Sequence, residues 1–225
     1  FLVDNSEPTD PKLGLFLVLR ATLAACMACS ELIWLYALHR RLTDSGDRSS
    51  IVIGWTAVVL LTCTGMNHVA GAYLPSATYC LAWMLASAAF LLQQYSWFVV
   101  IAITTTLATG WPFGVVMLVP MGIAVLCKTF SQVKLVRLIV LIVVVTALVQ
   151  GAVMLVDYEY YGVWISPTLN IFCYNAAGGG DELYGVEPVS YYVKNLILNL
   201  NIMAPLGLIS GPIVYFSRNQ PGKTD

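Results

Sequence analysis

Long apolar runs separated by short polar turns form the main pattern of this chain. The runs cover residues 13–38, 51–73, 75–94, 134–156 and 192–216. Each approaches or exceeds the ~20 residues that a helix needs to cross ~30 Å of hydrocarbon. The pattern therefore predicts a bundle of membrane-spanning helices.

One apolar stretch, 96–127, is interrupted by Gly110-Trp111-Pro112-Phe113. Proline removes a backbone donor and glycine loosens the helix, so the sequence predicts a break there. As a helix, the part before Gly110 would be only ~21 Å long, too short to span alone. We expect a broken or re-entrant hairpin over 96–127 rather than two full spans.

Composition assigns the chain to a class. Of the 225 residues, 59% are hydrophobic and only 10% are charged, whereas a soluble domain carries about 25% charge. We therefore expect an all-α polytopic membrane protein with residues 1–225 in a single transmembrane domain. The net charge of −1 gives no reason to expect nucleic-acid binding. Cys26 and Cys29 form an isolated C-x-x-C without a second pair, so we expect no metal site and no cofactor.

Basic residues predict the orientation. If the spans alternate, only Lys12, Arg20 and Lys194 fall on one side of the membrane, and the larger basic group falls on the other. That larger group comprises Arg40, Arg41, Arg48, Lys128, Lys134, Arg137, Arg218 and Lys223. The positive-inside rule places it in the cytosol. The segment 157–191 would then be a loop facing the lumen or the exterior.

The segment 157–191 is acidic and aromatic. It holds five of the twelve acids, and it has no Lys or Arg. Aromatic faces with carboxylate acceptors suit a carbohydrate site. An alternative is an ordered loop resting on helix ends, with Tyr and Trp in the aromatic belt of the membrane. The acids are Asp157, Glu159, Asp181, Glu182 and Glu187.

Two basic residues inside apolar runs have alternative roles. Arg20 lies near the luminal end of its run, where it would hold a lipid phosphate or extend to the interface. Lys194 begins a polar arc in the last run with Asn195, Asn199 and Asn201. That arc would provide either interhelical hydrogen bonds or a polar wall under the luminal loop.

Several short motifs together resemble one enzyme family. GDELYGVEP (180–188) is similar to a luminal LYGTEP motif, and the other matching motifs occur in the family's order and spacing. They are RATLAACMACSEL (20–32, with Arg20 and Glu31), AYLPS (72–76), GWPF (110–113), DYEYYG (157–162) and PTLNIFCYN (167–175). The family is that of the dolichyl-phosphate-mannose-dependent α-mannosyltransferases, glycosyltransferase family 22 of the C-type superfamily. The resemblance covers about residues 14–216.

The resemblance implies an inverting hexosyltransferase of the endoplasmic reticulum membrane. The donor would be dolichyl-phosphate mannose, the acceptor lipid-linked oligosaccharide of the N-glycosylation pathway, and the new bond an α-1,2 linkage. Membrane lipid would be a further partner. The runners-up are the α-1,6 step of the same pathway and a GPI-anchor mannosyltransferase. The resemblance assigns substrate binding to Trp111, Asp157, Glu159, Tyr161, Asn170, Asn175, Asp181, Tyr184 and Glu187, and phosphate binding to Arg20 and Lys194.

The sequence departs from the family at both ends. The family's first luminal loop carries an acidic motif that usually supplies the base, and at that place only Glu7-Pro8 is similar. Glu7 is therefore the candidate catalytic base. The family's HKE-x-RF motif would lie beyond Asp225, so we expect a fragment of a longer enzyme. The alternative from another class is a non-catalytic polytopic subunit or transporter, although a transporter should show repeated halves.

Overall fold

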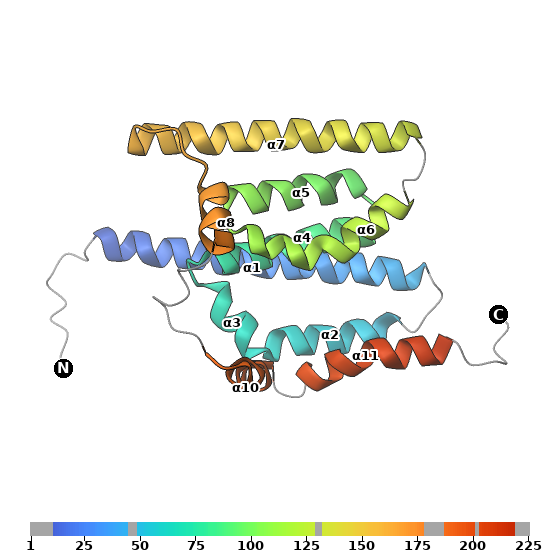
Figure 1. The fold of residues 1–225 in the computed structure, drawn as a ribbon. Coiled ribbons are helices and arrows are strands. Elements are labelled where there is room, and N and C mark those ends of the chain that lie inside the picture. Colours follow the sequence, from blue (N-terminus) through green and yellow to red (C-terminus); the bar gives the residue numbers. More distant parts are fainter. Residues whose placement is uncertain (1–10, 45–48, 129–131, 178–186, 201–202, 219–225) are drawn as a thin grey trace, which may run out of the picture.

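The structure is a computed structural model that describes residues 11–44, 49–128, 132–177, 187–200 and 203–218. All regular secondary structure in these ranges is helical (Figure 1). Two helices are long and apolar enough to cross a membrane, α1 (Pro11–Thr43) and α7 (Gln132–Tyr161). The chain is therefore an all-helical protein with two candidate membrane-spanning helices and several shorter apolar ones.

The helix α4 (Pro75–Leu91) lies at the centre of the packing. It contacts α1 on one side and α5 (Tyr95–Ala108) on the other. Its buried positions are mostly small, including Ala82, Ala86, Ala88 and Ala89. Small residues let helix backbones approach closely, as is usual in membrane bundles. Pro75 occupies the first helical position, where its missing N–H costs nothing.

The stretch after α5 reverses direction. Gly110 adopts a left-handed conformation with φ of 62°, and a 3-10 helix, η1 (Pro112–Leu118), continues into α6 (Val119–Lys128). α5 and the η1–α6 segment run in opposite directions in Figure 1. The helix breaks at Gly110-Trp111-Pro112, where the sequence predicts it.

The range 51–73 differs from the expected single helix. It contains α2 (Ser49–Thr62) and α3 (Thr64–Ala70), separated by Cys63 in an extended conformation. Asn67 explains how the break is tolerated, because its side-chain amide donates to the carbonyl of Leu61 at 2.9 Å. That carbonyl has lost its helical partner, and an unsatisfied carbonyl is costly in an apolar setting.

The segment 157–191, expected as a loop, is largely helical where it is described. α7 continues through Asp157 to Tyr161, α8 covers Pro167–Ala177, and α10 begins at Val189. The last apolar range also holds two helices, α10 (Val189–Leu200) and α11 (Met203–Arg218), which run in different directions in Figure 1. The sequence predicted one helix over 192–216.

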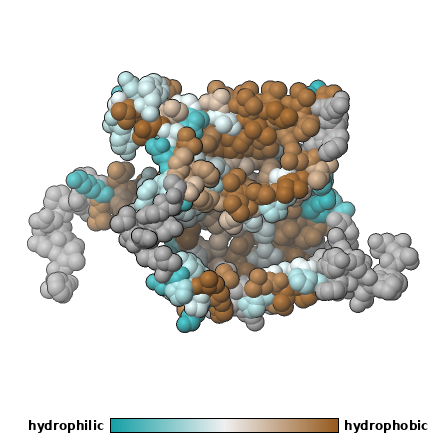
Figure 2. All heavy atoms as spheres, viewed as in Figure 1, coloured by the Kyte–Doolittle hydropathy of each residue, from teal (hydrophilic) through white to brown (hydrophobic). Residues whose placement is uncertain are grey.

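The two ends of the molecule differ in charge. The C-terminal ends of α1 and α6 and the N-terminal end of α7 lie at one end, which carries Arg40, Arg41, Lys128, Lys134 and Arg137. α3, α8 and the C-terminal end of α7 lie at the opposite end (Figure 1). In Figure 2 hydrophobic residues cover most of α7 between these ends, as expected of a surface that faces lipid.

Candidate functional site

The end of the molecule that carries α8 brings two of the sequence motifs into contact. α8 packs against the turn between α5 and η1. The hydroxyl of Thr168, which is 8% exposed, donates to the carbonyl of Leu107 at 3.1 Å. Phe172 stacks on Phe113 with ring centroids 6.5 Å apart, and Phe113 meets Trp111 edge-on at 5.7 Å. The motifs GWPF and PTLNIFCYN therefore form one aromatic contact.

A second aromatic contact fixes the end of α7. Gly162 has φ of 69° and donates its N–H to the carbonyl of Tyr158 at 2.8 Å. A left-handed glycine is a common helix stop. It turns the chain so that Trp164 stacks on Tyr158 with ring centroids 4.6 Å apart. The motif DYEYYG thus forms the end of a helix.

Ser166 links α7 to α8. Its hydroxyl accepts from the Gln150 side chain at 3.0 Å and from the backbone N–H of Leu169 at 3.4 Å. Serine before a proline at the first helical position is a standard helix start. Ser166 therefore caps α8 and at the same time ties it to α7. Sequence reasoning missed both Ser166 and Gln150, although the Ser-Pro pair is a recognisable helix-start signal.

A cavity of about 230 Å³ opens at this end between two motifs. Its walls come from the turn before α4 and from the end of α5, namely Tyr73, Leu74, Pro75, Thr78, Ala108 and Thr109. Tyr73, Leu74 and Pro75 belong to the AYLPS motif, and Ala108 and Thr109 lie directly before GWPF. The hydroxyls of Thr78 and Thr109 and the phenol of Tyr73 can bond sugar hydroxyls. The sequence indicated the motif but assigned none of these residues.

Arg20 lies beside the same turn. A β-carbon added at Gly71 would lie 3.6 Å from Arg20 Nε, so the guanidinium lies against the backbone of Gly71. Gly71 is two residues before Tyr73. The guanidinium also lies 5.5 Å from the ring centroid of Phe16. Both Arg20 and Tyr73 are exposed. A cation that leaves its donors open next to a hydroxyl-lined cavity is suited to a phosphate ester.

Asp157 differs from the other predicted acids. It is half-buried near the end of α7, and its Oδ2 atom is buried without a hydrogen-bond partner in the described residues. A buried carboxylate oxygen without a donor is costly. Glu159 and Tyr161, on the last turn of the same helix, are exposed.

The remaining predicted residues are dispersed. Asn175 donates to the carbonyl of Ile171 in its own helix at 2.8 Å, and Asn170 is exposed on α8. Glu187 is exposed just before α10, and Lys194 is exposed on that helix. Of the predicted site residues with a described position, none lines the cavity itself. Glu7, Asp181 and Tyr184 lie outside the described residues.

The described residues contain no group of His, Cys, Asp and Glu side chains that could hold a metal ion. The polar groups at this end include hydroxyls, carboxylates, amides, an ammonium and a guanidinium. These are suited to binding sugars and phosphates.

Comparison with known proteins decides the family. The model of the Alg9-like mannosyltransferase family matches residues 6–222. The chain belongs to this family. No solved structure matches it significantly.

Curated relatives of this family member come from plants and animals. The chain is 30% identical to alpha-1,2-mannosyltransferase ALG9 of Arabidopsis thaliana over 91% of its own length and 35% of the relative's. It is 27% identical to alpha-1,2-mannosyltransferase algn-9 of Caenorhabditis elegans, covering 93% of the chain and 34% of the relative. It is also 27% identical to alpha-1,2-mannosyltransferase ALG9 of Homo sapiens, covering 90% and 32%. This Alg9-like chain therefore spans about a third of the length of these relatives.

Proposed function

We propose that the chain is part of an α-1,2-mannosyltransferase of the endoplasmic reticulum. The enzyme transfers mannose from dolichyl-phosphate mannose to lipid-linked oligosaccharide in protein N-glycosylation. The observation that carries this proposal is the similarity to relatives named alpha-1,2-mannosyltransferases, which covers 90–93% of the chain. The same names favour the α-1,2 step over the α-1,6 and GPI-anchor alternatives.

The polytopic topology is part of the proposal. The shorter helices α2, α4, α5 and η1–α6 lie roughly along α1 and α7 in Figure 1, and together they would form the membrane bundle of a C-type glycosyltransferase. The basic end would face the cytosol by the positive-inside rule. The end with α8 and the cavity would then face the lumen.

In the proposed reaction a carboxylate takes the proton from an acceptor hydroxyl as the hydroxyl attacks the anomeric carbon of β-mannosyl phosphate. The bond to dolichyl phosphate breaks through an oxocarbenium-like transition state, and the configuration inverts. The candidate base, from the motif comparison, is Glu7. The leaving phosphate gains negative charge, so it requires a cation.

We assign the phosphate to Arg20 and Lys194. Arg20 lies against Gly71, at the edge of the cavity turn. α10, which carries Lys194, packs against α3, and α3 also packs against α1. Both cations therefore belong to helices that meet around α3, at the luminal end of the proposed topology. This arrangement supports a shared role in holding one phosphate.

We assign the mannose and the acceptor sugars to the surface around α8. Trp111 supplies an aromatic face, while Asp157, Glu159, Tyr161, Asn170, Asn175 and Glu187 supply polar groups near the ends of the surrounding helices. Asp181 and Tyr184 would join them from the intervening segment. The unpartnered Oδ2 of Asp157 supports a role for this residue, because a sugar hydroxyl would provide the missing donor.

An Arg20→Gln substitution in the full-length enzyme tests the proposal. We expect the KM for dolichyl-phosphate mannose to rise about tenfold or more, since a charge-assisted hydrogen bond contributes roughly 1.5–3 kcal/mol. The assay is mannose transfer to lipid-linked oligosaccharide in microsomes with equal enzyme levels. Arg40→Gln, at the opposite end of α1, is the matched control and should leave KM within twofold. Equal KM values for the two variants would remove Arg20 from the donor site.

A further inference from the structure

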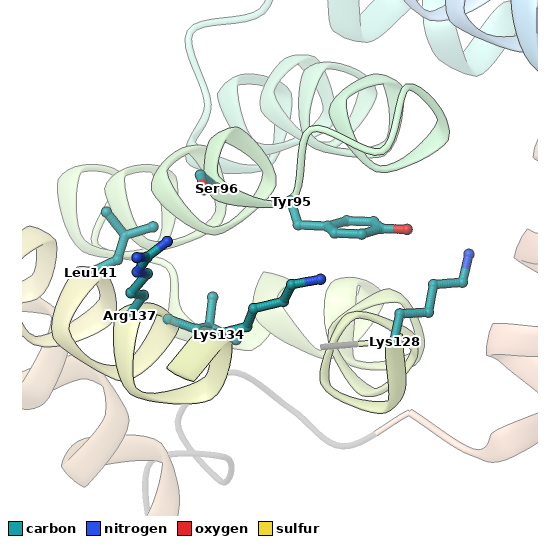
Figure 3. Close-up of a pocket in the computed structure, with 7 residues that line it drawn as sticks. Tyr95, Ser96, Lys128, Lys134, Arg137 and Leu141 are labelled. Carbon is teal, nitrogen blue, oxygen red and sulfur yellow. The ribbon is translucent and has the colours of Figure 1, made fainter. Parts of the chain in front are cut away.

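The basic end of the molecule contains a second cavity, far from α8. Its volume is about 320 Å³, and it lies between the start of α5, the end of α6 and the start of α7. Three cations line it, together with one aromatic ring and two leucines (Figure 3). The lining residues are Tyr95, Ser96, Lys128, Lys134, Arg137, Leu138 and Leu141.

Two of the three cations extend towards the same ring although they come from different helices. Figure 3 shows Lys128 of α6 and Lys134 of α7 extending towards the ring of Tyr95. The Lys128 ammonium lies 6.0 Å from the centroid of that ring and 5.8 Å from the centroid of Phe90. The aromatic faces attract the ammonium and hold it at the edge of the cavity.

The charges of these three cations are not neutralised by the described residues. No acidic side chain lines the cavity, and within the described ranges Lys128, Lys134 and Arg137 form no ion pair. Like charges gathered around one cavity repel each other, so an anion bound between them is favoured. Ser96 adds a hydroxyl that can donate to an oxyanion.

The apolar surface beside the cavity favours a lipid as the source of that anion. Leu138 and Leu141 line the cavity from α7 and belong to the packed core. The outer surface of α7 begins next to Arg137 with Val140 and Val144, which follow it at i+3 and i+7 and are 54% and 47% exposed. That surface is apolar and solvent-exposed, with none of its most hydrophobic window buried. An acyl chain can therefore lie along α7 while its headgroup occupies the cavity. Basic pockets of this kind, at the cytosolic ends of helices, suit anionic headgroups.

We propose that this cavity binds the phosphate-bearing headgroup of an anionic phospholipid. Lys128, Lys134 and Arg137 contact the phosphate oxygens, and the exposed Val140 and Val144 contact the start of an acyl chain. The site is separate from the proposed transferase site, because the two cavities share no residue. It would anchor the junction between α6 and α7 in the membrane.

Native mass spectrometry of the purified full-length protein tests the proposal. The probes are dioleoyl phosphatidylinositol phosphate, dioleoyl phosphatidylcholine and inositol phosphate without acyl chains. We expect the anionic lipid to bind at least tenfold more tightly than either of the others. Equal binding of phosphatidylcholine would overturn the charge argument. Equal binding of inositol phosphate would overturn the assignment to a lipid and indicate a free phosphate compound instead.

Variants locate the site. The double variant Lys134→Gln/Arg137→Gln should lose anionic-lipid affinity by about tenfold or more, because it removes two charge-assisted contacts. The control Arg40→Gln/Arg41→Gln removes the same charge from exposed positions at the same end of the molecule, and should change affinity less than threefold. The charge-retaining variant Lys134→Arg/Arg137→Lys should keep most of the binding, which guards against loss through misfolding. Equal losses in the two Gln variants would overturn the proposal.

Discussion

Glu187 is the residue at which a binding role and a structural role separate most clearly. It is exposed, it precedes Pro188, and α10 begins directly afterwards. An acid in this position stabilises a helix by ~0.3–1 kcal/mol through the helix dipole. It forms no hydrogen bond or ion pair with the described residues. We propose that its carboxylate binds a sugar.

We predict that Glu187→Gln in the full-length enzyme lowers mannose transfer tenfold or more while leaving the unfolding midpoint nearly unchanged. Glutamine keeps the shape but loses the charged hydrogen bond, which contributes roughly 1.5–3 kcal/mol. The measurements are transfer to lipid-linked oligosaccharide and thermal unfolding of the purified protein. Near-normal transfer would mean that Glu187 serves only the helix.

Gly114 provides a stability prediction. A β-carbon at this position of η1 would lie 2.6 Å from the ring of Tyr79, which is 3% exposed and has its hydroxyl 3.4 Å from that of Thr106. Gly114→Ala must therefore displace a buried ring, at a cost of about 1–3 kcal/mol. The thermal midpoint should fall by several degrees. Gly122→Ala is the control, because the space there is open, and an equal fall in both variants would contradict the packing argument.

At the scale of elements, the docking of α8 depends on a few contacts. The Thr168 hydroxyl and the Phe172 ring join α8 to the α5–η1 turn. Thr168→Val keeps the shape but removes a buried hydrogen bond of about 1 kcal/mol. Amide hydrogen exchange in 167–177 should become roughly fivefold faster.

Thr56→Val is the matched control for that measurement. The Thr56 hydroxyl bonds only to Val52 of its own helix, at 2.7 Å. Its loss should leave exchange in α8 unchanged. Unchanged exchange in the Thr168 variant would show that the aromatic contact alone holds α8.

The break of the α5–η1 hairpin was predictable, and the break between α2 and α3 was not. Pro112 and Gly110 change what the backbone can do, so a local signal exists. Cys63 has no such effect, and the break there depends on the Asn67 side chain reaching the Leu61 carbonyl. That bond exists only once α3 has turned. The pairing of Thr168 with Leu107 likewise joins residues far apart in sequence.

The site shows the same difference between what local sequence signals predict and what depends on the packing of helices. The motifs GWPF, PTLNIFCYN and DYEYYG lie at one end of the molecule, around Trp111, α8 and the end of α7, and the binding roles assigned to them stay predictions. They did not reveal that Tyr73 and Thr109 line one cavity, because that depends on how α4 packs against α5. Asn175, predicted as a ligand, donates one amide N–H within its own helix, a local bond that composition does not show, and its amide oxygen can still accept from a sugar hydroxyl.

For the whole molecule, topology is the property that the charge distribution predicts. Cysteine labelling in sealed microsomes measures it, using the full-length protein with Cys173 replaced. Ala176→Cys on α8 should be protected from an impermeant reagent added outside, and Gln94→Cys, between α4 and α5, should be labelled. Gln94 is exposed and directly precedes Tyr95, which lines the cavity at the basic end. Labelling of position 176 from the cytosolic side would reverse the orientation.

α7 also sets a length scale for the membrane around the protein. Between Arg137 and Asp157 this helix carries no charge, and at ~1.5 Å per residue the interval is about 28 Å long. The hydrocarbon layer of the endoplasmic reticulum is ~27 Å thick, against ~32–33 Å for the plasma membrane. In the thicker layer the charges at either end would be drawn inward or the bilayer would have to thin. Hydrophobic matching along this one helix therefore supports the proposed location in the thinner membrane of the secretory pathway's first compartment.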